Sequence, residues 1–225
     1  MPVSRLTAVL SGLLLTGCTV GKVVTPAPTS PFLAATGTDT SARIARLPFD
    51  HSWRSPKVDA SRYKYIIVKP VSTKWLRKEQ WEDSASEFVP DRARYLKQST
   101  ALANYWTTSL KKMFSSPICS YYITSDSSRP GTLILEVALT EVNFGRPPAG
   151  LGNMAFEARV KDAATGKTIA TVADRRATVS KIVDFNEKTL IRANQEILDQ
   201  WSGQLMEASN KELFPVVHSS LSSPF

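Results

Sequence analysis

Histidine and cysteine are scarce in this 225-residue chain, which has two of each. Histidine is the usual proton shuttle at neutral pH, and His51 and His218 both lie outside the segments with a helix or strand pattern, so acid–base catalysis has little support. Two cysteines cannot form the disulfide framework that replaces a core in very small secreted proteins. Stability must therefore come from apolar burial, which 42% hydrophobic residues can supply.

The start of the chain has no hydrophobic run long enough to span a bilayer. Leu6 to Leu15 is an uncharged stretch of ten residues, whereas a spanning helix needs about 20. It follows a short polar segment with one positive charge, Arg5. This order is typical of an export signal rather than of a membrane-spanning helix.

The export signal ends in Leu15-Thr16-Gly17-Cys18, which resembles the lipobox of bacterial lipoproteins. The resemblance implies cleavage between Gly17 and Cys18, a diacylglyceryl group on the Cys18 sulfur and a further acyl chain on its new amine. These lipids are the only attached groups that we expect, and they anchor firmly because each buried methylene contributes about 0.8 kcal/mol. Thr19, where an Asp favours the inner membrane in Gram-negative lipoproteins, implies a periplasm-facing position on the outer membrane.

Composition divides the chain into four parts. We expect a signal peptide at 1–17, the lipidated cysteine and a tether at 18–60, a single domain at 61–214 and a C-terminal tail at 215–225. The tether is rich in Thr, Ser, Pro, Ala and Gly, and its length predicts an r.m.s. reach of about 35 to 40 Å. Its later part contains Leu47-Pro48-Phe49 and His51-Ser52-Trp53, which have enough apolar side chains to dock on the domain.

Apolar periodicity predicts the fold class of the domain. Strands are expected at 62–71, 118–124, 131–144, 154–160 and 168–179, and helices at 91–114 and from 184 to about 213. A turn at 162–167, with Gly166 suited to positive φ, makes the last two strands a hairpin. The economical arrangement is α+β, a largely antiparallel sheet of about five strands with two amphipathic helices packed on one face.

Motifs for catalysis are missing from the sequence. It has no Gly-x-Ser-x-Gly elbow, no His-Glu-x-x-His pair and no closely spaced Cys/His cluster. Glu136 and Glu157 can face each other across neighbouring strands, and Asp174 begins an Asp-Arg-Arg run, but we favour solvated or salt-bridged strand positions for all of them. We therefore expect a protein that is not an enzyme and holds no metal. A hydrolase with an unrecognised carboxylate site is the alternative.

Rings alternate with cations in the loop that follows the first expected strand. The residues concerned are Lys74, Trp75, Arg77, Lys78 and Trp81. One hypothesis is a contact surface for anionic headgroups, cell-wall polymer or a partner protein. The other, which we favour, is that Trp75 and Trp81 fold back as a lid over the sheet. The net charge of +8 is spread along the chain, and export separates the protein from nucleic acid, so we expect envelope anions and no nucleic acid as partners.

Several stretches, together with the lipobox, resemble a family of uncharacterised proteobacterial lipoproteins with a domain of unknown function. They are the first strand, Ala101-Leu102-Ala103-Asn104-Tyr105-Trp106, the strand from Thr132 to Val142, and Ala173-Asp174-Arg175-Arg176. The resemblance implies a fold related to the small domains of curli-secretion-like lipoproteins, penicillin-binding-protein activators and the amino-terminal domain of the Tol-system propeller protein. Such domains generally bind other proteins.

The resemblance thus implies a non-enzymatic scaffold or accessory protein of a cell-envelope complex, held to the membrane by its lipid anchor. Its partner would be an envelope protein. A binder of peptidoglycan or anionic lipid is the alternative from the same compartment.

Overall fold

The computed structural model describes residues 25–77, 92–143, 152–178 and 187–213. The elements in chain order are α1 (Pro31–Ala34), β1 (His51–Arg54), η1 (Ala60–Arg62), β2 (Tyr65–Val68), α3 (Arg92–Phe114), β3 (Tyr122–Ile123), β4 (Thr132–Asn143), β5 (Gly152–Asp162), β6 (Thr168–Thr178), α4 (Glu187–Ala208) and η2 (Ser209–Leu213). None of the helices in these ranges is long and apolar enough to cross a membrane.

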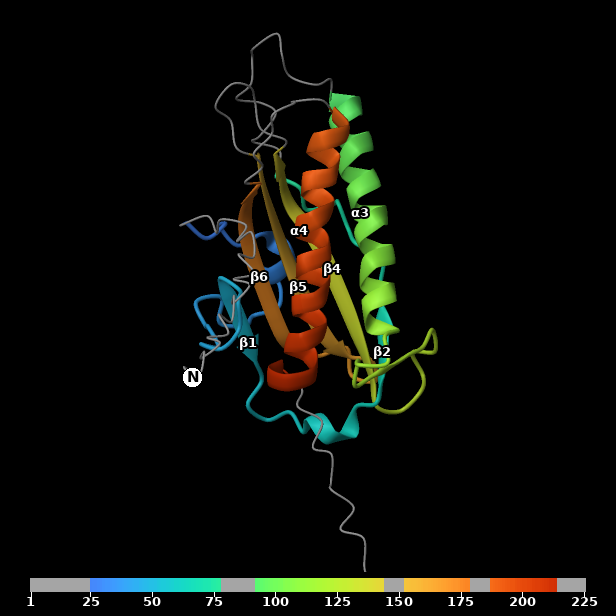
Figure 1. The fold of residues 1–225 in the computed structure, drawn as a ribbon. Helices are drawn as coiled ribbons and strands as arrows, with labels where there is room; N and C mark the ends of the chain where they lie inside the picture. The colour runs from blue at the N-terminus through green and yellow to red at the C-terminus, as the bar shows by residue number, and fades with distance from the viewer. Residues whose placement is uncertain (1–24, 78–91, 144–151, 179–186, 214–225) are drawn as a thin grey trace, which may run out of the picture.

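The strands form one mixed sheet in the order β1-β6-β5-β4-β2-β3. The pairs β1–β6, β5–β6 and β4–β5 are antiparallel, whereas β2 runs parallel to both β4 and β3. The long helices α3 and α4 lie side by side across one face, and α1 lies behind the sheet (Figure 1). The predicted α+β class is confirmed, and the sheet has six strands where about five were expected.

The hairpin of β5 and β6 follows the predicted turn. Gly166 has a φ of 68°, a left-handed conformation that favours glycine, and its N–H donates to the carbonyl of Asp162 at 2.8 Å. The long β4 pairs with β5 in a register that shifts between Leu139 and Glu141. Because directly opposed residues share a face, this irregularity puts Glu141, opposite Ala155, on the face away from the long helices.

Large aromatic side chains fill the space between the sheet and the long helices. Phe156 of β5 lies 4.7 Å from Trp201 of α4 and 5.2 Å from Trp106 of α3, measured between ring centroids. The indole N–H of Trp106 donates to the Ser202 hydroxyl at 3.0 Å. These contacts confirm the predicted buried faces of both helices. Leu96 shares the apolar spacing of Trp106 and Leu110 in the sequence, which predicts burial, but it is 42% exposed. Its neighbour Tyr95 is buried instead, with its hydroxyl donating to the carbonyl of Val142.

The segment predicted as a tether at 18–60 contributes part of the fold. Residues 51–54 form β1, which pairs with β6, and buried apolar side chains come before it in the chain. They are Phe32, Leu33, Leu47 and Phe49. Burial of these side chains, together with the backbone hydrogen bonds of β1, ties the chain to the sheet from about residue 30 onward. The predicted boundary at residue 61 is therefore too late.

The expected strand at 118–124 is regular only at Tyr122–Ile123. The preceding residues are held by η2 instead of a neighbouring strand, because the Asn210 side chain accepts from the N–H of Ser120 at 2.9 Å and donates to the carbonyl of Ile118 at 2.8 Å. The hydroxyl of Tyr121 is buried against the carbonyl of Ser209. Side-chain hydrogen bonds thus replace the strand ladder here.

Trp106→Ala is expected to lower the free energy of unfolding by about 3 to 5 kcal/mol, because it leaves a cavity at the centre of the aromatic cluster. Chemical denaturation monitored by circular dichroism measures the loss. Leu96→Ala, on the exposed side of the same helix, is the control and is expected to change the free energy by about 0.5 kcal/mol or less. Equal losses in the two variants would contradict this assignment of the core.

Candidate functional site

Lys74, Trp75 and Arg77 contact the N-terminal segment of the same chain. The Trp75 ring is half-buried, 6.1 Å from the ring of Phe32, and the Lys74 ammonium lies 5.4 Å from the Trp75 ring centroid. The guanidinium of Arg77 donates to the carbonyl of Pro28. Trp75 therefore packs on Phe32 of α1, in the segment that Glu157 binds. Lys78 and Trp81 of the same predicted surface, as well as Gly17 and Cys18 of the lipobox, lie outside the described residues.

Glu136 and Glu157 lie on the face of the sheet away from the long helices and do not form a carboxylate pair. Glu136 is opposite Arg159 and Glu157 is opposite Ala138. Glu136 accepts from Arg159 at 2.6 Å and pairs with Lys161 at 2.9 Å. Burial opposes ionisation of Glu136, but these hydrogen bonds and charges outweigh it and lower its pKa. The structure therefore gives Glu136 basic partners in place of a second carboxylate.

Glu157 binds the N-terminal segment. One carboxylate oxygen accepts from the backbone N–H of Ser30 at 2.6 Å, and the other accepts from the Ser30 hydroxyl at 2.5 Å. Glu157 is only 3% exposed. This burial raises the pKa of its carboxyl group, although the hydrogen bonds from Ser30 oppose the rise. Both oxygens are engaged, so Glu157 acts as the docking point for the segment that carries α1.

Asp174 and Arg176 form a buried ion pair on the helix side of the sheet, with a nitrogen–oxygen distance of 2.9 Å. The Trp201 indole also donates to Asp174 at 2.9 Å, and the Arg176 guanidinium donates to the side chains of Gln200 and Gln204. Of the predicted solvated or salt-bridged strand position, the salt bridge is confirmed for these two residues, but both are buried instead of lying at a solvated edge. β1 covers the edge of β6 and α4 covers its face, so the charges are paired in the interior.

Arg175 points to the opposite face of β6, where it bonds to the buried Glu141 at 2.6 Å. This pair joins β6 to β4 across the intervening β5. Glu136 joins β4 to β5 through Arg159 and Lys161, and Arg176 joins β6 to α4 through Gln200 and Gln204. Removing the cation that pairs with Glu141 or Asp174 would leave an uncompensated buried charge, which is strongly destabilising. Each of these charges has an ion-pair partner within the protein.

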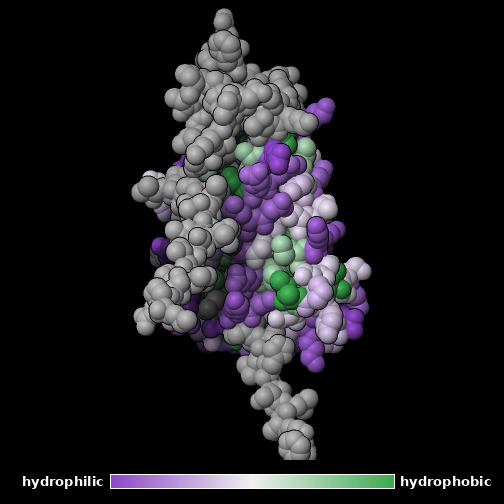
Figure 2. Space-filling view, viewed as in Figure 1, coloured by the Kyte–Doolittle hydropathy of each residue, from purple (hydrophilic) through white to green (hydrophobic). Residues whose placement is uncertain are grey.

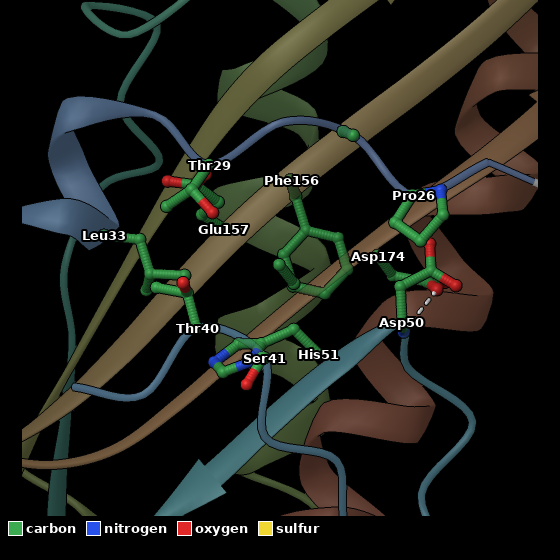
Figure 3. Close-up of a pocket in the computed structure, with 12 residues that line it drawn as sticks. Pro26, Thr29, Leu33, Thr40, Ser41, Asp50, His51, Phe156, Glu157 and Asp174 are labelled. Carbon is green, nitrogen blue, oxygen red and sulfur yellow. Dashed lines mark hydrogen bonds between the residues drawn. The ribbon is translucent and has the colours of Figure 1, made fainter.

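A pocket of about 200 Å³ lies where the N-terminal segment meets β1 and β6 (Figure 3). Its lining includes Pro26, Ser41, Asp50, His51, Glu157 and Asp174. His51 shares a hydrogen bond of 2.8 Å with the hydroxyl of Thr171, and burial lowers its pKa, so the imidazole is neutral at pH 7. Among the described residues, no three His, Cys, Asp or Glu side chains are arranged to hold a metal ion.

The edge at β3 carries exposed apolar side chains, and sequence analysis did not identify it as a site. Ile118, Tyr122 and Ile123 are 70%, 72% and 40% exposed, and β3 is the last strand of the sheet. Figure 2 shows apolar surface near the lower end of α3 on an otherwise largely polar face. From the sequence alone, the apolar run at 118–123 is equally consistent with a strand covered on both sides. The strand order in the structure is what shows that β3 lies at an edge.

The β3 edge is held in place on both sides. Tyr122 is paired with Tyr65 of β2, and their ring centroids are 6.2 Å apart. The Arg129 guanidinium stacks 3.7 Å from the Tyr65 ring centroid. Asn210 fixes the loop that carries Ile118, as described above. These contacts therefore fix the backbone that carries Ile118, Tyr122 and Ile123. We call these three residues the β3 edge patch.

A family of proteins of unknown function, DUF3313, matches residues 46–205. A comparison with curated proteins gives no match. Among solved structures, the PelC dodecamer from Paraburkholderia phytofirmans is 12% identical, with 69% of this chain and 95% of that chain covered and a TM-score of 0.36. A DUF330 protein from Xanthomonas campestris is 12% identical over 69% and 88% of the two chains, with a TM-score of 0.40.

A minor lipoprotein from Acinetobacter baumannii is 11% identical over 65% of this chain and 91% of that chain, with a TM-score of 0.34. Structural similarity at these TM-scores does not support an inference about function. The assignment of a function therefore depends on the residues of this chain.

Glu157→Gln tests the docking of the N-terminal segment. The raised pKa means that, just above the ordinary value of 4.5, folded Glu157 holds a proton that the unfolded chain has released. The free energy of unfolding of the parent therefore falls as pH rises through this window. Glutamine still accepts from the Ser30 N–H but does not titrate. We expect the stability of the variant relative to the parent to increase with pH above about 4.5 and then to level off.

Urea denaturation at a series of pH values between 4 and 8 measures this difference. Glu196→Gln removes an exposed carboxylate from α4 and controls for the general loss of negative charge. Stability curves of the Glu157→Gln variant and the parent that stay parallel over the whole range would contradict the burial of an ionisable Glu157.

Proposed function

Because the chain belongs to the DUF3313 family of proteins of unknown function, we propose from its own residues that it is a lipid-anchored, periplasm-facing accessory protein that scaffolds a cell-envelope complex. In this proposal Cys18 holds the protein on the outer membrane and the β3 edge patch binds another envelope protein. The lipobox Leu15-Thr16-Gly17-Cys18 at the end of an export signal supports the anchor. The observation that carries the binding function is the exposure of Ile118, Tyr122 and Ile123 at the edge of the sheet.

Two physical properties make the β3 edge patch suited to a protein partner. Exposed apolar area gains about 25 cal/mol for each Å² that a partner removes from water. Tyr122 and Ile123 are consecutive in β3 and therefore offer this area on opposite faces of the edge, where an added strand can contact both. The N–H groups of Tyr122 and Thr124 donate to β2. In a strand the N–H of the intervening Ile123 points the other way, so it is directed toward an added strand. The short edge therefore favours an extended segment with apolar side chains.

Charge around the patch defines the partner further. Lys64 and Arg129 are exposed beside β2 and β3, and Lys111 and Lys112 lie in the last turn of α3 before the loop that carries Ile118. Their positive charge favours a partner segment with acidic residues next to its apolar ones. The partner that fits is an envelope protein with an exposed acidic and apolar stretch.

The carboxylates considered for a hydrolase support a structural role. Glu136 is paired with Arg159 and Lys161, Glu157 binds Ser30, and Asp174 is buried against Arg176. A general acid or base has to reach a proton of the substrate, and these groups face partners within the protein. We accordingly propose a protein without catalytic residues and without a cofactor other than its lipids.

Tyr122→Ser combined with Ile118→Ser is expected to abolish the capture of the partner after chemical crosslinking in intact cells. Both side chains are exposed, so the midpoint of thermal unfolding is expected to stay close to that of the parent. Leu96→Ser removes an exposed apolar side chain from α3, away from the patch, and serves as the matched control. Equal recovery of the same crosslinked protein from the parent, the double variant and Leu96→Ser would show that the β3 edge is not the binding site. Co-sedimentation with purified cell wall, without a crosslinked protein, would favour polymer binding.

Cys18→Ser is expected to abolish incorporation of labelled palmitate and to release the protein from the membrane fraction, because the sulfur that accepts the diacylglyceryl group is gone. Fractionation of cell envelopes on a density gradient checks both the loss and the membrane of origin. Unchanged palmitate labelling would disprove the lipobox assignment.

A further inference from the structure

The N-terminal end of the described chain lies beside β1. Pro26 lines the same pocket as Ser41 and Asp50, and Figure 3 shows it next to Asp50 and Asp174. Four residues later, Ser30 is bonded to Glu157 through both its backbone and its hydroxyl. The lipid anchor is thus connected to the domain at the β1 side of the sheet.

Few residues separate this point from the proposed anchor. Pro26 follows Cys18 by eight residues, which span at most about 28 Å when fully extended. The composition of residues 18–60 predicts a tether of forty-odd residues, but the chain is already held to the sheet at Ser30. Ser30 follows Cys18 by twelve residues, so the point at which the sheet holds the chain lies at most about 43 Å from the headgroups.

The loop before β1 presents cations at this side. Arg43, Ala45 and Arg46 are exposed. The loop is closed by two backbone hydrogen bonds, from the N–H of Ser52 to the carbonyl of Ala42 at 3.0 Å and from Leu47 to Ile44 at 2.9 Å. Residues 43–57 contain four cations, Arg43, Arg46, Arg54 and Lys57, and a single acid, Asp50. Asp50 is only partly exposed and accepts from the N–H of Arg175.

We propose that Arg43 and Arg46 bind the acidic headgroups of the bilayer that carries the anchor, so that the domain is held at two points. This inference rests on the lipid anchor of the proposed function. The planar guanidinium group matches the phosphate oxygens of a lipid headgroup. Because the anchor already keeps the loop within a short span of the surface, the contact is intramolecular and needs few charges to form.

A membrane contact at this loop has a consequence for the partner site. β1 and β3 are the two opposite edges of the sheet, separated by five strand spacings of about 4.8 Å each. When the β1 side rests on the headgroups, the β3 edge patch is therefore on the far side of the domain. The two contacts can form at the same time.

The test uses the lipidated mature protein reconstituted in vesicles. An environment-sensitive fluorophore is attached at Ala45→Cys, in a Cys119→Ser background that removes the other thiol of the mature chain. Vesicles contain phosphatidylcholine alone or phosphatidylcholine with phosphatidylglycerol. We expect a blue shift of emission only with phosphatidylglycerol, and we expect salt to reverse it since the Debye length shrinks from about 10 Å at 0.1 M to about 3 Å at 1 M.

Arg43→Glu with Arg46→Glu is expected to abolish the shift. Lys111→Glu with Lys112→Glu makes the same change in net charge on α3 and is expected to keep it. Emission that is identical in the two kinds of vesicle, or equal in the two double variants, would overturn the headgroup contact. Flotation with phosphatidylcholine vesicles reports the lipid anchor separately, so a failure of the anchor is distinguishable from a failure of the loop.

Discussion

The hydrogen bonds between Ser30 and Glu157 fix where the N-terminal segment is held on the domain, and therefore where the proposed anchor at Cys18 would join it. They fix the chain on the face of the sheet away from the long helices, at 2.6 and 2.5 Å, in a buried environment. Arg159 adds to the same docking, because it donates to the carbonyl of Phe32 and stacks on the ring of that residue. Upstream of Ser30, Pro26 lies beside β1, and β1 is the opposite edge of the sheet from β3.

The two faces of the sheet are stabilised by different chemistry. On the helix face, Trp106, Phe156 and Trp201 pack as an aromatic cluster that removes a large apolar area from water. The other face carries Glu136, Glu157 and Glu141, each bonded to a cation or to the N-terminal segment. Buried charges of this kind contribute little net stability when they are paired but are costly when a partner is removed. The main effect of these charges is therefore to determine which segment packs on this face, and their contribution to the free energy of unfolding is smaller.

Long periodic elements could be predicted from the sequence, since their patterns depend only on local burial. The helices that became α3 and α4 and the hairpin at Gly166 agree with the structure. β1 was missed because a strand of four residues with a histidine and a serine has no clear alternation, and its surroundings have the composition of a linker. Its pairing with β6 is a contact between distant parts of the chain, which a local pattern does not encode.

The partners of the charged residues could not be predicted from the sequence either. Alternation places Glu136 and Glu157 on one face, but the register decides that Arg159 is opposite Glu136 and that Ser30 reaches Glu157. The exposure of Tyr122 likewise depends on β3 being the last strand. The proposed lipobox is different in kind, because a motif of this type is linear and its recognition would not depend on the fold of the domain.

The central claim is that one edge of the sheet faces the membrane and the other faces a partner. The most direct measurement is photo-crosslinking in living cells, with a photoreactive amino acid placed at position 43 in one strain and at position 122 in another. The account predicts lipid adducts from position 43 and a discrete protein adduct from position 122. Protein adducts from position 43 together with lipid adducts from position 122 would show that the domain is oriented the other way.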